Sequence, residues 1–197
     1  MRAAALSPGL SDPVADAQGC FRALLDAMSR PGLVRRVSAE LRPPAPLAPA
    51  AAAVLLTLAD ATTPVWTDAG SDAAAWLAFH AGCPVAGSPG DAAFVLACGV
   101  PPALDALAQG TDEEPHRGAT LIAQVAALEE GRGSGGGWRL RGPGIETEHR
   151  LRVSGLPDGF AARWAANRAA FPRGVDLILC SGCHVAALPR TTAIGLG

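Results

Sequence analysis

Hydrophobic residues recur every three or four positions in several stretches of the chain, and this spacing predicts amphipathic helices. The first helix is expected from Asp16, a suitable N-cap, to Arg30, and Pro31-Gly32 ends it. Its predicted apolar stripe consists of Cys20, Phe21, Leu24, Leu25 and Met28. Residues 50–59 are apolar on every side, which predicts a buried helix. Further helices are expected over 71–82 with Ser71 as N-cap, over 102–109, and over 157–171 with Phe160, Trp164 and Phe171 on one face.

Runs of consecutive or alternating apolar residues predict strands between these helices. They cover residues 33–37, 64–67, 92–98, 120–128 and 138–141. Residues 145–153 alternate strictly, with Glu146, Glu148, Arg150 and Arg152 on one side. This pattern predicts a half-buried strand whose charged outer face can form Glu–Arg pairs across an antiparallel neighbour. Two apolar runs, 175–180 and 183–188, flank Ser181-Gly182 and predict a β-hairpin.

Helices and strands that alternate along a chain favour an α/β fold. The early strands are separated by helices, whereas the late strands follow one another through short links, so we expect a mixed sheet. The 197 residues form one domain, 1–197, in which residues 1–15 are expected to be an extended N-terminal arm.

The net charge of -2 and the pI of about 6.1 give no basic field that would attract nucleic acid. Only 17% of the residues are charged and the mean hydropathy is +0.24. This composition predicts apolar surface that a partner covers, although an alanine-rich composition alone gives similar values. No segment is long and apolar enough to span a membrane, and residues 1–6 are too short for a signal-peptide core. We therefore expect a cytoplasmic protein with five reduced cysteines.

The chain contains no lysine and no tyrosine. Without lysine, no side chain can form a Schiff base with pyridoxal phosphate, and the glycine run at 131–137 cannot be a Walker A site. That run is interpreted as a flexible hairpin tip. No nucleophile–base pair, paired carboxylates or metal cluster stands out, so we expect no metal and no cofactor, and a role in completing a site rather than in carrying the chemistry alone.

Cys180-Ser-Gly-Cys183-His184 matches the haem-attachment pattern, but it spans the predicted hairpin of a protein expected in the cytoplasm. A redox pair is a second alternative, although such pairs act at a helix N-terminus. A zinc site is a third and would need further ligands, which only His80, His116 and His149 could supply. The interpretation that we favour is two thiols that flank a turn.

Arg190, Thr191 and Thr192 follow the last strand of the hairpin and form the main candidate site. A guanidinium and two hydroxyls suit phosphate, phosphonate or triphosphate oxygens. The alternative is an arginine that ties the C-terminus to a carboxylate such as Asp176 or Asp60.

Three further residues are candidates for contact with an anionic ligand. Asp60 follows a predicted helix, and its alternative role is local hydrogen bonding. His80 ends another helix as a possible acid or base, although a packed histidine is more common. Arg22 lies beside the stripe of the first helix and can reach either an anion or a surface carboxylate.

Several segments together resemble one protein family. They are residues 21–32, which include Ser29-Arg30-Pro31-Gly32, then 55–60, 63–66, 79–80, 118–122, 140–145 and the hairpin segment 171–192. In this order they resemble the PhnH family, subunits of the bacterial carbon–phosphorus lyase core complex. The chain differs in its lysine-free, alanine-rich surface and in the glycine run.

The resemblance implies a three-layer αβα sandwich similar to the pyridoxal-phosphate transferase fold, without that cofactor. It also implies a role in organophosphonate breakdown, in which an alkylphosphonate displaces adenine from ATP to give ribose 1-alkylphosphonate 5-triphosphate. The implied partners are PhnG, PhnI, which carries the nucleosidase chemistry, and PhnJ, which cleaves the carbon–phosphorus bond. Alone, the chain is expected to form a homodimer. A non-catalytic module that binds a phosphorylated small molecule is the alternative hypothesis.

Overall fold

The computed structural model describes residues 7–37, 40–131 and 137–197. Most of the glycine run, 132–136, therefore lies outside the described residues, as do residues 1–6 of the expected arm. The α-helices are α1 (Pro13–Ser29), α2 (Pro49–Leu58), α3 (Ser71–Ala81) and α4 (Phe160–Ala169). Short 3₁₀ turns are η2 (Pro89–Asp91), η3 (Leu104–Ala106) and η4 (Pro115–Arg117).

The N-cap of helix α1 lies four residues earlier than expected. Asp12, not Asp16, is its N-cap: the Asp12 Oδ1 accepts a hydrogen bond from the Ala15 N–H at 3.0 Å. The Asp16 carboxylate in turn accepts from the Asp12 N–H at 3.1 Å, which gives a reciprocal cap. The predicted stripe is divided, because Cys20 and Leu24 are buried, whereas Phe21 and Leu25 are 50% and 58% exposed.

The other helices follow the prediction with local corrections. Residues 50–55 of α2 are all buried, which confirms the buried helix. Helix α3 begins after Gly70 and has no side-chain cap, so Ser71 is its first residue and not its N-cap. The helix expected over 102–109 is only the 3₁₀ turn η3. Phe171 lies beyond the end of α4 and is exposed, whereas Phe160 and Trp164 are buried as expected.

A six-stranded mixed sheet has the order β1-β9-β8-β4-β3-β2. Strands β2, β3, β4 and β8 are parallel, and β9 and β1 are antiparallel to their neighbours. The strands are β1 (Arg35–Arg36), β2 (Val65–Thr67), β3 (Phe94–Ala97), β4 (Thr120–Gln124), β8 (Asp176–Ser181) and β9 (His184–Leu188).

The predicted hairpin is present as β8 and β9, but its turn is shifted by one residue. Ser181 pairs with His184, so the loop residues are Gly182 and Cys183, not Ser181 and Gly182. Gly182 has a φ of 56° and Cys183 does not have a positive φ. A positive φ at the first loop position alone is typical of a type II′ turn, which suits the twist of a hairpin.

A second, four-stranded antiparallel sheet has the order β10-β6-β7-β5. Its strands are β5 (Ala127–Glu130), β6 (Trp138–Arg141), β7 (His149–Ser154) and β10 (Ala193–Leu196). The strand expected over 120–128 is thus divided between the two sheets at residues 125–126. The strand expected over 145–153 begins only at His149. A β-carbon on Gly144 would lie 2.0 Å from the Ser29 carbonyl oxygen, so the chain before β7 packs against the end of α1 instead of pairing.

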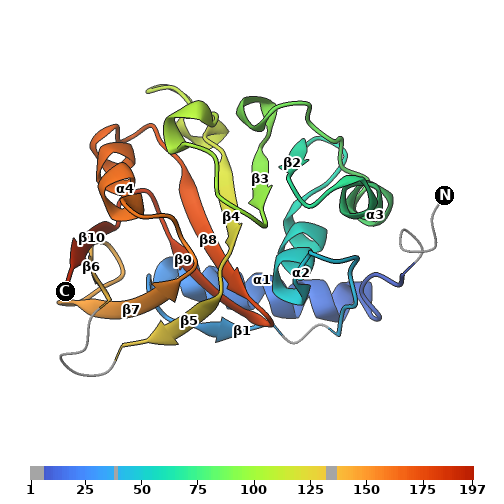
Figure 1. Ribbon diagram of the computed structural model, residues 1–197, viewed down its shortest axis with the longest axis horizontal. Helices are drawn as coiled ribbons and strands as arrows, with labels where there is room; N and C mark the ends of the chain where they lie inside the picture. Colours follow the sequence, from blue (N-terminus) through green and yellow to red (C-terminus); the bar gives the residue numbers. More distant parts are fainter. Residues whose placement is uncertain (1–6, 38–39, 132–136) are drawn as a thin grey trace.

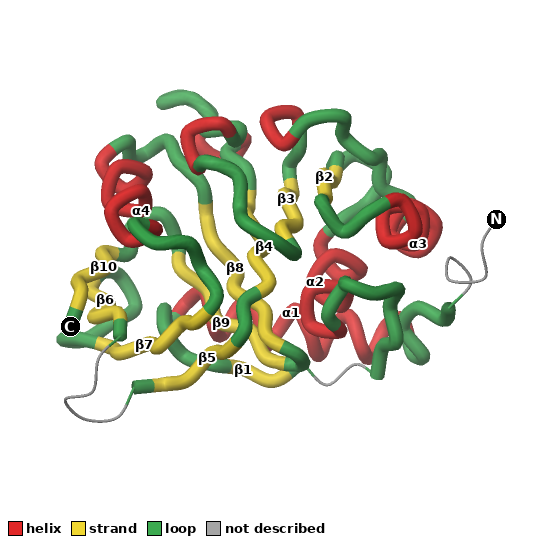
Figure 2. Tube along the Cα trace, in the orientation of Figure 1, coloured by secondary structure: helices red, strands yellow, loops and turns green. Residues whose placement is uncertain are grey.

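Residues of the six-stranded sheet alternate between two cores. Leu96, Ile122 and Ile178 belong to the core with α1, α2 and α3. Leu121, Leu177 and Leu179 belong to the core with α4 and the second sheet, where Trp164, Leu140 and Leu151 are fully buried. The molecule therefore has three layers, with the large sheet in the middle (Figures 1 and 2).

The α/β class is confirmed, with two corrections to the expected sandwich. Strands β5, β6, β7 and β10 form a separate sheet instead of extending the large one, and this sheet shares the second outer layer with α4. Similarity to the pyridoxal-phosphate transferase fold stays a prediction.

Candidate functional site

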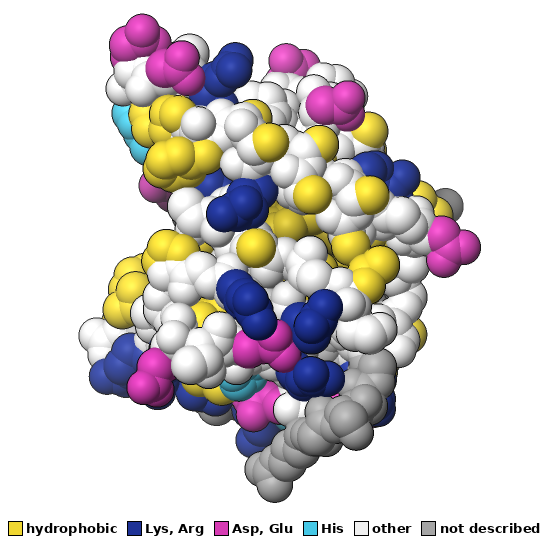
Figure 3. All heavy atoms as spheres, turned by 90° about the vertical axis from the view of Figure 1, so that its left-hand side faces the viewer, with side chains coloured by type: hydrophobic (Ala, Val, Ile, Leu, Met, Phe, Trp, Pro, Cys, Tyr) yellow, Lys and Arg dark blue, Asp and Glu magenta, His cyan; other side chains and the backbone are white. Residues whose placement is uncertain are grey.

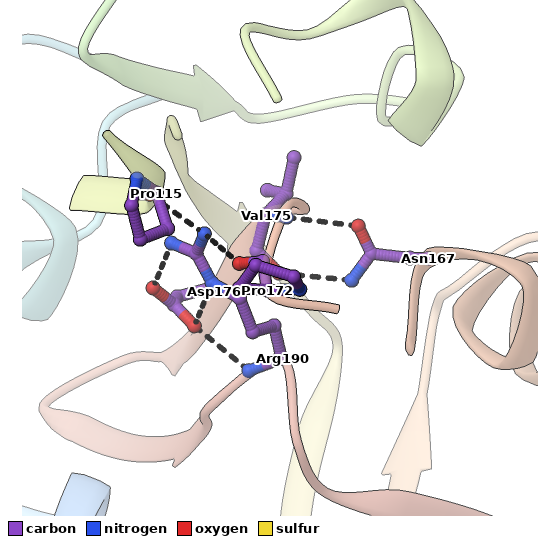
Figure 4. Close-up of polar contacts among 6 residues, drawn as sticks. All are labelled: Pro115, Asn167, Pro172, Val175, Asp176 and Arg190. Atoms are coloured by element: carbon purple, nitrogen blue, oxygen red, sulfur yellow. Dashed lines mark hydrogen bonds and ion pairs between the residues drawn. The ribbon is translucent and has the colours of Figure 1, made fainter. Parts of the chain in front are cut away.

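Arg190 lies just after β9 and is bound from several directions by the chain itself (Figure 4). Its Nε and Nη2 donate to the two carboxylate oxygens of Asp176, at 3.2 and 2.7 Å, and its backbone N–H donates to the same carboxylate at 2.7 Å. Its Nη1 donates to the carbonyl oxygens of Pro115 and Pro172, at 2.9 and 3.3 Å. The Arg190 side chain is 11% exposed and that of Asp176 25%. Arg190 thus ties the chain to the start of β8, which is the second of the two roles predicted for it.

A buried asparagine extends this cluster into α4. The Asn167 amide donates to the Val175 carbonyl at 3.0 Å and accepts from the Val175 N–H at 2.8 Å (Figure 4). Asn167 satisfies both polar groups of the residue before β8, so α4 and β8 are held in a fixed relation. Asn167 was not predicted as a site residue; its only signal in the sequence is that a polar residue lies one turn from Trp164 on the apolar face of a helix.

The two threonines after Arg190 do not form an accessible rim with it. Thr192 is fully buried, and its carbonyl accepts a hydrogen bond from Trp164 Nε1 at 2.7 Å. Its Oγ1 is buried without a hydrogen-bond partner among the described residues. The Thr191 carbonyl accepts from Arg168 Nε at 3.1 Å. Through these two carbonyl groups, the segment between β9 and β10 is held against α4.

Asp60 and His80 are also engaged locally. The Thr62 hydroxyl and N–H each donate to Asp60 Oδ1 at 2.8 Å, and these bonds hold the pKa of Asp60 below its usual value. His80 Nε2 lies 3.0 Å from the Ser7 carbonyl oxygen, and its ring packs 4.7 Å from that of Trp76. The alternative roles predicted for both residues, local hydrogen bonding and packing, match this geometry.

Arg22 lies on the exposed side of α1. It lines a groove of about 320 Å³ together with Ala17, Gln18, Phe21 and Thr57. This groove lies on the helical layer, in which His80 lies in the last turn of α3 and Asp60 follows α2, whereas Thr192 is buried against Trp164 of the other core. The structure therefore brings Arg190, Thr191 and Thr192 together with Asp176, but it does not join them to Asp60, His80 and Arg22 in one site.

Four of the five cysteines are poor candidates for a thiolate site, because burial raises their pKa values. All five are free; Cys180 lies in β8 just before the turn, as predicted, whereas Cys183 is itself a residue of the turn and does not flank it. Burial raises the pKa of Cys180, and the nearby thiols of Cys20 and Cys98 add to this effect. No group of three or more metal-ligating side chains occurs within residues 7–37, 40–131 and 137–197.

Comparison with known proteins assigns the family. The model of a family described as bacterial phosphonate metabolism protein (PhnH) matches residues 8–195. The chain is 45% identical over 193 residues to "Alpha-D-ribose 1-methylphosphonate 5-triphosphate synthase subunit PhnH" of Rhizobium meliloti (strain 1021), which covers 95% of this chain and 94% of the relative. The chain belongs to the PhnH family. A second relative matches only part of the chain. It is "Putative C-P lyase subunit protein HtxG" of Stutzerimonas stutzeri, which is 47% identical over 87 residues, or 44% of this chain and 43% of the relative.

The match to PhnH confirms the resemblance seen in the sequence and gives a structural meaning to two of its segments. Residues 29–32 and 142–145 are far apart in the chain, yet Gly144 lies directly against the Ser29 carbonyl. These PhnH segments thus form one junction between α1 and the second sheet. Within the part of the chain that the structure describes, no helix has the length and apolar composition needed to cross a membrane.

Proposed function

We propose that this protein is a subunit of the bacterial carbon–phosphorus lyase core complex and supports formation of ribose 1-alkylphosphonate 5-triphosphate from ATP and an alkylphosphonate, with release of adenine. The observation that carries the proposal is the 45% identity, along 95% of the chain, to a protein named as a subunit of the corresponding methylphosphonate synthase. The relative named as a putative C–P lyase subunit agrees with it.

Within the complex, the chain contributes to assembly and substrate handling, and PhnG, PhnI and PhnJ are its partners. The engagement of Arg190, Asp60 and His80 in contacts within the chain supports this division, because these side chains have structural partners. The five free cysteines, four of them with a raised pKa, support a cytoplasmic location.

An apolar stripe on the outer side of α1 supports the assembly role. Val14, Phe21 and Leu25 are 68%, 50% and 58% exposed, and their spacing of seven and four residues places them on one helix face. The adjoining face, with Cys20, Leu24 and Ala27, is already buried in the core. Since an outer helix normally presents polar residues to water, the second apolar face fits a contact with another subunit of the complex.

Co-purification tests the proposal. The tagged chain, co-expressed with PhnG, PhnI and PhnJ homologues, is expected to elute with all three, and the assembly is expected to release adenine from ATP and methylphosphonate. The purified chain alone is expected to release none. Elution of the chain without the other three subunits, or adenine release by the chain alone that a point mutation within it abolishes, would contradict the proposal.

A pair of variants tests the α1 stripe in the same experiment. Phe21→Glu places a charge in the stripe and is expected to reduce co-purification strongly while the melting temperature stays close to that of the unmodified chain. Phe171→Glu is the matched control, because Phe171 is 61% exposed but lies after α4, away from α1. If the two variants co-purify equally well, the contact lies on another surface. If Phe21→Glu prevents homodimer formation but leaves co-purification intact, the stripe contacts a second copy of the chain.

A further inference from the structure

The outer face of the second sheet is rich in arginine. Arg139 and Arg141 on β6 and Arg150 and Arg152 on β7 alternate with buried residues, so all four point away from the core. Figure 3 shows dark-blue side chains gathered around a carboxylate on the side of the molecule that carries β6 and β10. In the pairing of β6 with β7, Arg139 stands directly opposite Arg150.

Two carboxylates only partly neutralise this face. Arg152 Nη1 lies 3.0 Å from the carboxylate of Glu129, its partner across the strands. Glu148 bridges Arg141 and Arg150, at 3.1 and 3.3 Å. Within the described residues, Arg139 forms no ion pair and donates from Nη2 to the Leu196 carbonyl at 3.1 Å. Like charges directly opposite each other destabilise a sheet, so an anion near Arg139 and Arg150 would relieve their repulsion.

Next to these arginines the surface is hollowed. The register places Ala193 beside Arg141 and Gly195 beside Arg139 on the neighbouring strand β10. Because both residues are small, space remains above β10, and a β-carbon on Gly195 would make only ordinary van der Waals contacts with Arg139, to its O, Cβ and Nε atoms at 3.6, 3.7 and 3.8 Å. The hollow has a volume of about 250 Å³ and is lined by Arg139, Arg141, Glu148, Ala193, Ile194 and Gly195.

We propose that this arginine hollow binds the oligophosphate chain of a triphosphorylated ligand. Guanidinium groups bind phosphate oxygens in bidentate fashion, and alternate residues of a strand lie about 7 Å apart, so Arg139 and Arg141 can bind oxygens of different phosphates along one oligophosphate chain. Glu148 holds Arg141 in the lining of the hollow, while Arg139 forms no ion pair within the described residues and supplies an unbalanced charge. The choice of a triphosphate rests on the proposed function, in which both ATP and the product carry one.

Titration calorimetry of the purified full chain with inorganic triphosphate at low salt tests this proposal. Saturable binding is expected, and it should weaken as salt rises, because the contacts are charged and exposed. Arg139→Gln is expected to weaken binding about tenfold, the effect of one lost charge-assisted hydrogen-bonding group. The variant is expected to keep its melting temperature, since it removes one of two opposed like charges.

Arg152→Gln is the matched control. Arg152 lies on the same face and carries the same charge, but it does not line the hollow, so its loss is expected to change affinity by less than about threefold. Equal weakening in both variants would overturn the proposal in favour of a general surface field. Absence of saturable binding, or unchanged binding by Arg139→Gln, would overturn it as well. Loss of co-purification in Arg139→Gln without any triphosphate binding would assign the face to an acidic partner. None of these outcomes changes the expected co-purification of the unmodified chain, so failure of this proposal can be told apart from failure of the proposed function.

Discussion

At the scale of single residues, the cluster around Arg190 shows how one side chain can join segments from distant parts of the sequence. Its guanidinium reaches the carbonyl of Pro115 in η4, the carbonyl of Pro172 before β8 and the carboxylate of Asp176 in β8. Asp176 is bound by both the backbone and the side chain of Arg190, so the carboxylate is neutralised and nearly saturated with donors. Removal of the arginine would leave a half-buried carboxylate and two carbonyls without these donors.

Arg190→Ala is therefore expected to lower the free energy of unfolding by about 2–4 kcal/mol, because it breaks a largely buried ion pair on one side. Urea unfolding measures the loss. Arg173→Ala is the control: Arg173 pairs with Asp112 at 3.3 Å, but both side chains are more than half exposed, so about 0.5 kcal/mol is expected. If the two variants lose the same stability while complex activity falls only in Arg190→Ala, Arg190 acts in ligand binding instead.

The Arg190–Asp176 contact could be anticipated from the sequence, whereas the contact of Asn167 could not. Both ends of the predicted hairpin are visible in the apolar pattern, and antiparallel pairing brings the residue before one strand next to the residue after the other. The observed register, with Leu177 opposite Leu188, differs from the predicted one because the turn is shifted, but it still brings Arg190 close to Asp176. Asn167 contacts Val175 only because α4 packs against the sheet, and no local sequence pattern indicates how close these two residues come.

At the scale of elements, helix and strand types were predictable, but strand ends depended on tertiary contacts. The alternation from 145 to 153 continues through residues that do not pair, because Gly144 packs against Ser29 and the Glu148 carboxylate binds Arg141 and Arg150. The apolar run from 120 to 128 passes from one sheet into the other without any change in composition. At its bend, the Val125 N–H donates to the Cys180 carbonyl in β8 and the Ala126 N–H to the Ser154 carbonyl in β7.

The β8–β9 turn gives a prediction at this scale. Gly182→Ala is expected to lower stability by about 1–2 kcal/mol, because Gly182 has a φ of 56° and an L-residue with a β-carbon resists the left-handed region. A β-carbon there would meet no atom within 4 Å, so the cost comes from the backbone alone.

Gly87→Ala serves as the control for this substitution. It also has open space around it but no positive φ, so a change within about 0.5 kcal/mol is expected. Thermal unfolding of both variants compares them. Equal stability of Gly182→Ala and the unmodified chain would argue against the type II′ turn.

At the scale of the whole molecule, the absence of lysine and tyrosine leaves cysteine as the only side chain that normally titrates between histidine and arginine. Burial raises the pKa of Cys98 to about 12, helped by the charge of Asp68, and burial also raises the pKa of Cys180, Cys20 and Cys83. In the unfolded chain these thiols ionise near their ordinary pKa of about 8.5. The alkaline behaviour of the protein is thus set by its buried thiols.

The sign of this effect follows from proton binding. Because the folded state keeps protons that the unfolded chain releases, stability is constant below about pH 8 and falls as the pH rises above it, by up to about 1.4 kcal/mol per pH unit for each buried thiol. Urea unfolding at a series of pH values is expected to show this fall, and Cys98→Ala is expected to make it shallower. Stability that does not change up to about pH 11 would contradict the raised pKa values.

The place of β8 has a consequence for how the protein is made. This strand lies at the centre of the large sheet, between β4 and β9, yet it begins only at residue 176 of 197. Strand β10, at the edge of the second sheet, begins at residue 193. A nascent chain that has just completed β7 and α4 therefore exposes one side of β4 and one edge of β6, without the strands that cover them. Neither sheet can close before β8, β9 and β10 have left the ribosome, so completion of both cores waits for these three strands.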